Sequence, residues 1–285
     1  MKEKDPFVIG IGEVLWDMLP DGKRCGGAPA NVIYHLGQLG VRSAVVSAVG
    51  NDANGDELVD FLRGKGIDTS FIARNGLSTG TVGVTLQDGI PSYEIHCPAA
   101  WDAIPFCDSL KNVLPEVTAA VYGSLAQRDP RSRSTIKSIL KALPDNCLKI
   151  FDINLRQEYY SKEMIQESLK LADVLKINDE ELEVVARMFQ LNGTREETLA
   201  SLKQMWNLKY VILTLGASGS MLFDGVSFTT YPVAFCPKVE DTVGCGDSFL
   251  AAWCGAILKG ESADSAMKAG TILSAKVAGQ KGAMA

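Results

Sequence analysis

The alternation of short apolar runs with longer helical patterns constrains the fold of this 285-residue chain more than any other feature. Each run is almost continuously apolar, which is typical of parallel strands covered on both faces. Strands that alternate with helices predict an α/β fold, in which a parallel sheet lies between two layers of helices. The expected strands are residues 7–12, 43–49, 119–122, 148–153, 174–177 and 210–215. The expected helices are residues 30–39, 56–65, 134–142, 180–189, 196–206, 247–258 and 263–278.

One region departs from this alternation. Residues 81–96 alternate apolar with polar or small side chains on both sides of an Asp-Gly turn, which predicts an antiparallel hairpin with one solvent-facing surface. Residues 13–25 also look extended and are interrupted by a Pro-Asp-Gly turn. We therefore expect a single domain over residues 1–285, with a small antiparallel β lid formed by segments of about 13–25 and 80–100.

The amino-acid composition indicates which classes of partner the protein binds and in which cell compartment it is found. The net charge is −6 and no run of five or more like charges occurs, which argues against nucleic acid as a partner. No segment approaches about 18 uninterrupted apolar residues, and the first ten residues lack the apolar stretch of a signal peptide. We therefore expect a cytoplasmic protein without a membrane partner. Seven cysteines without a C-x-x-C pair, and only two histidines, favour free thiols and argue against a zinc site.

Polar residues follow several of the expected strands. Asp17 comes after the first strand, and Asn154 and Arg156 come after the fourth. Asn178 follows the fifth strand and Gly216 follows the sixth. Because open parallel sheets bind ligands at the carboxyl ends of their strands, these residues predict a site at that edge.

The strongest local motif is DTVGCGD, residues 241–247, in which Gly244 and Gly246 flank Cys245 before an apolar helical pattern. A glycine-rich turn that opens a helix presents unpaired backbone N–H groups, which suit the charge of a phosphoryl group in transfer. Asp247 at the helix start is placed to accept a proton from an attacking hydroxyl. The alternative interpretation makes Asp247 an ordinary N-cap, but the Gly-x-Gly before it favours the anion site.

A second motif, GGAPAN at residues 26–31, also leads into an expected helix. Gly26 and Gly27 allow the backbone to approach a ligand closely, and Asn31 can offer its amide to sugar hydroxyls. Upstream, Asp17 in GEVLWDMLP can accept hydrogen bonds from two hydroxyls. Taken alone, the motif is equally consistent with a glycine-rich loop before a helix, and Asp17 with a turn residue.

These motifs resemble the two signatures of the ribokinase-like (PfkB) carbohydrate kinases. DTVGCGDSF is similar to the family's D-T-x-G-A-G-D-x-F, with Cys245 in place of the usual alanine. The resemblance spans residues 12–283 in matching order, and it implies a ribokinase-like three-layer sandwich. Other nucleotide motifs fail, because no G-x-x-x-x-G-K-[ST] is present and Leu15 breaks the G-x-G-x-x-G fingerprint that begins at Gly10.

The resemblance implies roles for individual residues. Asp247 would be the catalytic base, and the backbone of Gly244, Cys245 and Gly246 would form the anion hole with it. Arg156, in DINLR, would lie near the reacting phosphates. The implied sugar-binding residues are Asp17, Gly26, Gly27 and Asn31, and the implied nucleotide-binding residues are Asn178, Thr214, Gly216 and Gly219.

Two further residues are implied near metal ions. In KINDEE, Asn178 and Glu181 match the family's N-x-x-E motif, which influences the Mg²⁺ and phosphate environment through water. An Asn N-cap followed by an acidic first turn predicts the same letters, so both interpretations are equally supported. Asp241 is the candidate contributor to a site for a monovalent cation such as K⁺.

The expected activity is that of an ATP- and Mg²⁺-dependent sugar kinase. GGAPANVIYHLGQLG, GEVLWDMLP and DINLR look most similar to fructokinases, so the expected reaction converts D-fructose to fructose 6-phosphate. Ribose and 2-keto-3-deoxygluconate remain alternative substrates. Two other classes of function stay open, a non-catalytic sugar or nucleotide sensor and a nicotinamide-dependent oxidoreductase.

The resemblance also bears on assembly. Lids can pair in this family, so the exposed hairpin also suggests a homodimer.

Overall fold

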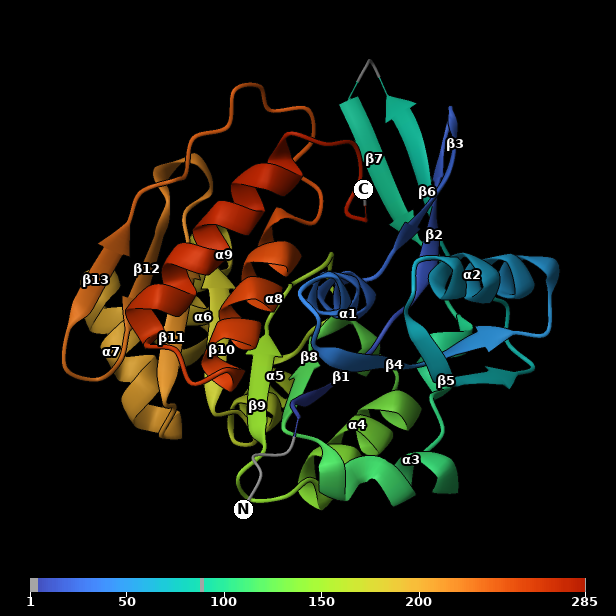
Figure 1. Ribbon diagram of the computed structural model, residues 1–285, viewed down its shortest axis with the longest axis horizontal. Coiled ribbons are helices and arrows are strands. Elements are labelled where there is room, and N and C mark those ends of the chain that lie inside the picture. The colour runs from blue at the N-terminus through green and yellow to red at the C-terminus, as the bar shows by residue number, and fades with distance from the viewer. Residues whose placement is uncertain (1–4, 88–89, 285) are drawn as a thin grey trace.

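The computed structural model describes residues 5–87 and 90–284 (Figure 1). Its centre is an open sheet with the strand order β13-β12-β11-β10-β9-β8-β1-β4-β5. The strands from β11 to β5 are parallel, as predicted, and β12 and β13 add an antiparallel edge. The strands are β1 (Phe7–Ile11), β4 (Arg42–Gly50), β5 (Asp68–Asn75), β8 (Ala119–Tyr122), β9 (Leu148–Asp152), β10 (Val174–Asn178), β11 (Tyr210–Thr214), β12 (Ser220–Phe223) and β13 (Phe228–Tyr231).

Helices cover both faces of this sheet and give the predicted three-layer α/β sandwich (Figure 1). In β1, Val8 packs into one buried cluster with Ile33, and Ile9 packs into the other with Ile136. Burial on both faces explains why the strands read as continuous apolar runs. One face carries α1 (Ala28–Gln38), α2 (Ala53–Gly64), α8 (Cys245–Leu258) and α9 (Ala263–Ala278), and the other carries α3 (Asp108–Val113), α4 (Pro130–Ala142), α5 (Lys162–Leu169), α6 (Asp179–Phe189) and α7 (Arg195–Trp206). None of the helices in the described ranges is long and apolar enough to cross a membrane.

The differences from the predicted elements lie at helix starts and sheet edges. α2 and α4 begin earlier than predicted, because Asp52 and Asp129 cap them by accepting hydrogen bonds from the N–H groups of Gly55 and Arg131. Neither β5 nor β13 was predicted, since both lie at an edge and keep exposed side chains that hide the apolar pattern. The strand β12 and the short helices α3 and α5 were also missed.

A second sheet, which we call the lid, has the strand order β3-β2-β6-β7 and stands off the main sheet (Figure 1). Its strands are β2 (Leu15–Leu19), β3 (Gly22–Gly26), β6 (Gly80–Gln87) and β7 (Ile90–Ile95). Each hairpin is antiparallel, as predicted, and a parallel pairing of β2 with β6 joins the two hairpins. Val82 and Ile95 are cross-strand partners and are buried, as the predicted alternation requires. The Asp-Gly turn at residues 88–89 and the side chains of residues 84–93 lie outside the described part of the chain.

Candidate functional site

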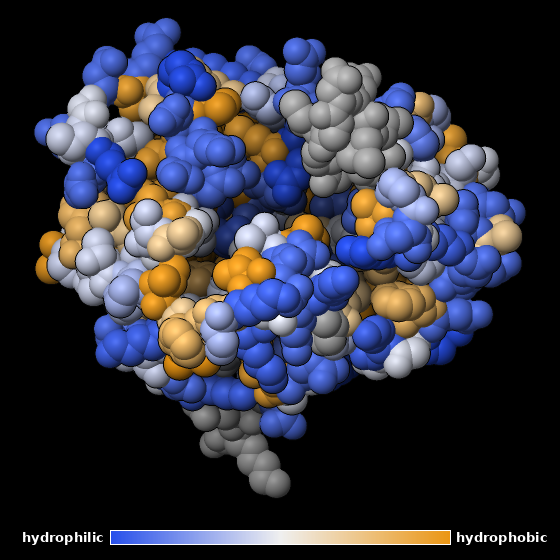
Figure 2. All heavy atoms as spheres, turned by 90° about the horizontal axis from the view of Figure 1, so that it is seen from above, coloured by the Kyte–Doolittle hydropathy of each residue, from blue (hydrophilic) through white to orange (hydrophobic). Residues whose placement is uncertain are grey.

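The candidate residues from both ends of the chain meet beside the lid. Asn31 of α1 contacts Asp247 of α8, and Arg156, which follows β9, acts on both Asp247 and Asp17 of β2. Seen from above, the surface is hollowed between the lid and the rest of the molecule, and hydrophilic side chains lie in the hollow (Figure 2). Arg156 therefore lies with Asn31 and Asp247, but Asp17 belongs to strand β2 of the lid and not to the edge of the main sheet where it was predicted.

The turn before α8 has the geometry of an anion-binding site. Gly244 is the N-cap with φ of 79°, and a Cβ atom there would lie 2.5 Å from the Cβ of Ala283, so the position requires glycine. No group in the described ranges accepts a hydrogen bond from the N–H of Gly246 or Asp247. These N–H groups and the positive end of the helix dipole favour a negatively charged ligand. The helix begins at Cys245, two residues before the predicted start.

Asp247 lies in the first turn of α8. It is not the N-cap of this helix, because that position is occupied by Gly244. Its Oδ2 accepts a 2.7 Å hydrogen bond from Asn31 Nδ2. Burial is the main cause that raises the pKa of Asp247 to about 6, and the neighbouring Asp152 carboxylate acts in the same direction. Lys176, the hydrogen bond from Asn31 and Arg156 act against that rise in pKa. A carboxylate of this kind beside a turn that favours an anion is suited to accept a proton from a hydroxyl.

Asp17 and two glycines form the lid side of the site. A Cβ atom on Gly26 would lie 2.8 Å from Asp17 Oδ2, and one on Gly27 would lie 2.3 Å from the carbonyl oxygen of Glu13. Close packing therefore requires glycine at position 27, where the neighbour is backbone and φ is 118°, whereas at Gly26 the neighbouring side-chain ends could move aside. Burial raises the pKa of Asp17, and Arg156 acts in the opposite direction. A half-buried carboxylate at this place can accept hydrogen bonds from sugar hydroxyls.

Glu13 is a residue of this site that the sequence interpretation missed. It is only 2% exposed, and its Oε1 accepts a 3.3 Å hydrogen bond from the N–H of Ala28. Its Oε2 has no hydrogen-bond partner among the described residues. Burial raises the pKa of Glu13 to about 7, while Arg156 lowers it and Asp247 raises it. The only signal in the sequence was an acidic residue inside an apolar run.

Asp152 and Lys176 form a buried ion pair behind the anion-binding turn. Lys176 Nζ lies 2.8 and 3.0 Å from the two carboxylate oxygens of Asp152. Asp152 is 4% exposed and Lys176 is 7% exposed. A Cβ atom on Gly246 would lie 3.2 Å from Lys176 Nζ, so the ammonium group sits next to the turn. Neither residue was predicted as part of the site, and the signal was a charged residue within each of two apolar strands.

Arg156 faces the acidic side of the site from the segment after β9. Burial raises the pKa of Glu13, Asp17 and Asp247, and the guanidinium of Arg156 acts against that rise in each case. The backbone next to it is fixed by Glu181, whose Oε1 accepts a 2.9 Å hydrogen bond from the N–H of residue 155. Arg156 is exposed, so its donors are available to a ligand in the hollow.

Asn178 and Glu181 form a capping box at the start of α6, which is one of the two interpretations of KINDEE. Asn178 Oδ1 accepts a 2.8 Å hydrogen bond from the N–H of Glu181, and Glu181 Oε2 accepts one of 2.9 Å from the N–H of Asn178. Backbone N–H groups therefore engage both carboxylate oxygens of Glu181. A water-mediated influence of Glu181 on Mg²⁺ stays a prediction.

The predicted nucleotide-binding turn follows β11. Thr214 is the register partner of Asn178, which places the turn beside the start of α6. Gly216 and Gly219 have φ of 53° and 97°, and a Cβ atom on Gly219 would lie 2.1 Å from the carbonyl oxygen of Tyr231. An ordinary compact turn needs these glycines as much as a nucleotide site does, so the binding role stays a prediction.

Asp241 links the C-terminal segment to the anion-binding turn. Its Oδ1 accepts a hydrogen bond from the N–H of Val243 and its Oδ2 accepts one from the N–H of Gly282, both at 3.0 Å. Next to this link, His35 Nε2 lies 2.8 Å from the carbonyl oxygen of Ala283. In the part of the chain that the structure describes, no three His, Cys, Asp or Glu side chains are grouped to hold a metal ion. The role of Asp241 toward K⁺ stays a prediction.

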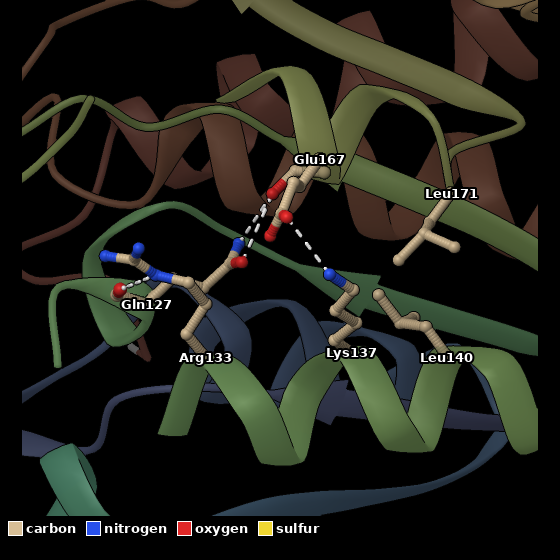
Figure 3. Close-up of a pocket in the computed structure, with 7 residues that line it drawn as sticks. Gln127, Arg133, Lys137, Leu140, Glu167 and Leu171 are labelled. Carbon is tan, nitrogen blue, oxygen red and sulfur yellow. Dashed lines mark hydrogen bonds and ion pairs between the residues drawn. The ribbon is translucent and has the colours of Figure 1, made fainter. Parts of the chain in front are cut away.

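A separate hollow lies between α4 and α5 (Figure 3). The ion pair of Lys137 with Glu167, at 3.0 Å, spans it, and Arg133 Nε donates a hydrogen bond to the carbonyl oxygen of Gln127. It shares no residue with the candidate site. Its lining residues are Gln127, Arg133, Lys137, Leu140, Glu167, Ser168 and Leu171.

Known proteins resemble this chain along most of its length. An uncharacterized sugar kinase from Pyrococcus horikoshii is 30% identical over 271 residues, which cover 89% of this chain and 83% of the relative. Its crystal structure matches with a TM-score of 0.82 over 98% of this chain and 93% of that one. An ATP-dependent 6-phosphofructokinase from Thermoanaerobacterium thermosaccharolyticum is 28% identical over 297 residues, which cover 96% and 88% of the two chains.

A fructokinase from Vibrio cholerae O395, solved with fructose, ADP and a calcium ion, matches with a TM-score of 0.85 at 25% identity. The match covers 99% of this chain and 96% of that chain. Residues 21–285 also match the pattern that defines the pfkB family carbohydrate kinases. These findings confirm the resemblance and the fold that the two motifs predicted. The chain belongs to the pfkB family of carbohydrate kinases, enzymes that transfer a phosphoryl group to a sugar hydroxyl.

Proposed function

We propose that the protein is an ATP-dependent fructokinase that converts D-fructose to fructose 6-phosphate. The observation that carries the proposal is the pairing of Asn31 with Asp247 next to the free N–H groups at the start of α8. This pairing joins the predicted sugar side to the predicted phosphate side. The similarity to a fructokinase solved with fructose and ADP supports the choice of substrates.

In the proposed reaction, Asp247 accepts the proton of the primary hydroxyl on C6 of fructose. The hydroxyl oxygen forms a bond to the γ-phosphorus of ATP, and the bond from that phosphorus to the β,γ-bridging oxygen breaks. ADP leaves with the electron pair of the broken bond. The N–H groups of Gly246 and Asp247, together with Arg156, stabilise the charge on the transferred group.

The sugar is oriented by groups on the opposite wall. Asp17 accepts hydrogen bonds from hydroxyls, and the backbone at Gly27 lies close to the bound ring. Asn31 is 4% exposed, and its Oδ1 has no hydrogen-bond partner among the described residues, so it can accept a hydrogen bond from a further hydroxyl. Closure of the lid would exclude water from the transfer.

Mg²⁺ enters this proposal with the nucleotide. Its chemistry would be to neutralise the charge on the β- and γ-phosphates. Glu181 would act on it indirectly, and Asp241 would contribute to a K⁺ site near the C-terminal segment. We also propose that residues 1–285 form one kinase domain with the lid inserted, and that the protein is cytoplasmic, which suits its seven free cysteines.

A coupled assay of ADP release tests the substrate. The panel comprises fructose, glucose, ribose, 2-keto-3-deoxygluconate and fructose 6-phosphate, the last because one relative is a 6-phosphofructokinase. We expect the highest kcat/KM with fructose. A higher value for another member would replace fructose by that sugar. If no sugar releases ADP, the kinase proposal is wrong and the sensor alternative gains support, and reduction of NAD with a sugar would support the oxidoreductase.

A further inference from the structure

The Asp152–Lys176 pair occupies a place where the fold does not require charge. Ile150 and Val174, two residues before Asp152 and Lys176 and on the same face of the sheet, are completely buried and apolar. Removing two charges from water is unfavourable, and apolar residues of similar size often replace a buried pair without loss of stability. The position of the pair, behind the turn that opens α8, therefore points to a role in the site.

Charged groups reach Asp247 from several elements. Asp152 of β9 raises the pKa of Asp247 and Lys176 of β10 lowers it. The two members of the pair therefore act on the pKa of this carboxyl group in opposite directions. Burial lowers the pKa of Lys176, but the carboxylates of Asp152, Glu181 and Asp247 together raise it above its usual value, so Lys176 stays positively charged. The other groups around Asp247 are Arg156 after β9, Glu13 after β1, the Cys245 thiol in its own helix and the uncharged amide of Asn31 in α1.

We propose that the buried Asp152–Lys176 pair is a positioning element for phosphoryl transfer, in which Asp152 strengthens Asp247 as a base and Lys176 adds positive charge behind the anion-binding turn. The inference rests on the proposed function of Asp247. The pair acts through Asp247 and through the N–H groups of the turn. Because each charge is held by the other, the fold can keep both of them out of water and next to the turn.

Three variants separate the two charges. Lys176→Met removes the ammonium and keeps the length of the side chain, and Asp152→Asn removes the carboxylate charge and keeps its shape. The double variant carries a neutral pair and leaves no unpaired buried charge. Lys137→Met is a matched control, because it removes a lysine from an ion pair outside the site.

The variants should shift the pH dependence of kcat/KM in opposite directions. Without Lys176, Asp247 binds its proton more tightly, so the rising limb of the profile moves up by about one pH unit. Without the Asp152 charge, the limb moves down by about one pH unit. The limb of the double variant lies between these two positions, and Lys137→Met leaves it unchanged.

The pair should also affect the transfer step more than the binding of sugar. Lys176→Met and the double variant should lower kcat by about tenfold or more, with little change in KM for the sugar. The measurement is ADP release from about pH 5 to pH 9 with the sugar that the wild type turns over best. Thermal melts of each variant show whether it is folded.

Opposite shifts of the limb in the single variants support the inference. Unchanged limbs, or shifts in the same direction, overturn it. If neither single variant folds, the double variant decides, since a wild-type kcat overturns the inference and a lowered kcat with an unchanged KM supports it. A wild type that releases no ADP with any sugar refutes the proposed function instead, so the two failures are distinguishable.

Discussion

At the scale of single residues, the site depends on carboxyl groups that are withdrawn from water. Burial is the largest influence on the pKa of Glu13, Asp17 and Asp247, and it raises all three values. A carboxylate with a raised pKa is a stronger base than one in water. Since the pKa of Asp247 is about 6, this group is still mostly ionised at neutral pH. These properties suit a residue that must take a proton from an alcohol.

Asp247→Asn keeps the shape of the side chain and removes the base. We expect kcat to fall by roughly 10²- to 10⁴-fold, while binding of the sugar survives. In the wild type, kcat/KM should rise with pH through an inflection near 6, because only ionised Asp247 accepts the proton. Steady-state kinetics and calorimetric titration with sugar measure both effects. A variant with near-normal turnover would show that another group is the base.

Glu13 should make the protein less stable as the pH rises. Its pKa is about 7 in the folded protein and 4.5 in the reference state, so the folded state binds the extra proton between these values. Stability therefore falls through that window and stays lower above it, by an amount on the order of 3 kcal/mol. Glu13→Gln removes this titration and should flatten the dependence of the melting temperature on pH. Equal slopes for the wild type and the variant between pH 5 and about 8 would refute this prediction.

The residues that the sequence predicted are those with local patterns. Glycines around Cys245 and the Gly26-Gly27 pair identify a turn by spacing alone, so Asp247 and Asn31 could be found. Glu13 and Lys176 could not, because their importance depends on neighbours brought in by other strands. An isolated charge within an apolar run is the only trace that such residues leave in a sequence.

At the scale of elements, α8 has a left-handed glycine at each end. Gly244 at its N-cap and Gly260 after its last turn share φ of 79°, but only Gly244 has a close neighbour, Ala283. Gly260→Ala should lower stability by about 1 kcal/mol and leave activity unchanged. Gly244→Ala causes the same backbone strain and also a steric clash with Ala283. It should therefore displace the anion-binding turn and lower kcat/KM for ATP by about 10²-fold.

Thermal melts and ATP-dependent kinetics of the two variants check this prediction. The Gly260 variant controls for backbone strain in the same helix. Equal kinetic effects of both substitutions would mean that the position of the turn does not matter to the nucleotide.

The predictability of elements follows from what each one packs against. Interior strands such as β1 and β8 are covered on both faces, and their apolar runs reveal them. β5 and β13 lie at edges, where alternating or continuous exposure removes that signal. For α6, a capping box and a metal-directed motif use the same letters at positions 178 and 181, so only the hydrogen bonds could show that the box is present.

At the scale of the whole molecule, the lid offers a surface for assembly. Its outer strands, β3 and β7, have a sheet neighbour on one side only, and a second lid could pair with either. We predict a homodimer formed through the lid, so sedimentation should give twice the mass of the 30.6 kDa chain. Dilution over a wide range should reveal the dissociation constant. A single-chain mass at all concentrations would refute the dimer.

The pairing of Asn31 with Asp247 joins positions that are 216 residues apart, and His35 meets Ala283 across 248 residues. On the ribosome, the proposed sugar-binding residues Asp17 and Asn31 therefore emerge first, and the proposed base and the anion-binding turn emerge last. Until α8 is made, α1 lacks the helix that packs beside Leu36, and this apolar surface must be shielded by other means. A chain released before α8 is made would have only part of the site and would lack the proposed base, Asp247. Sugar phosphorylation would therefore require that synthesis had continued beyond α8.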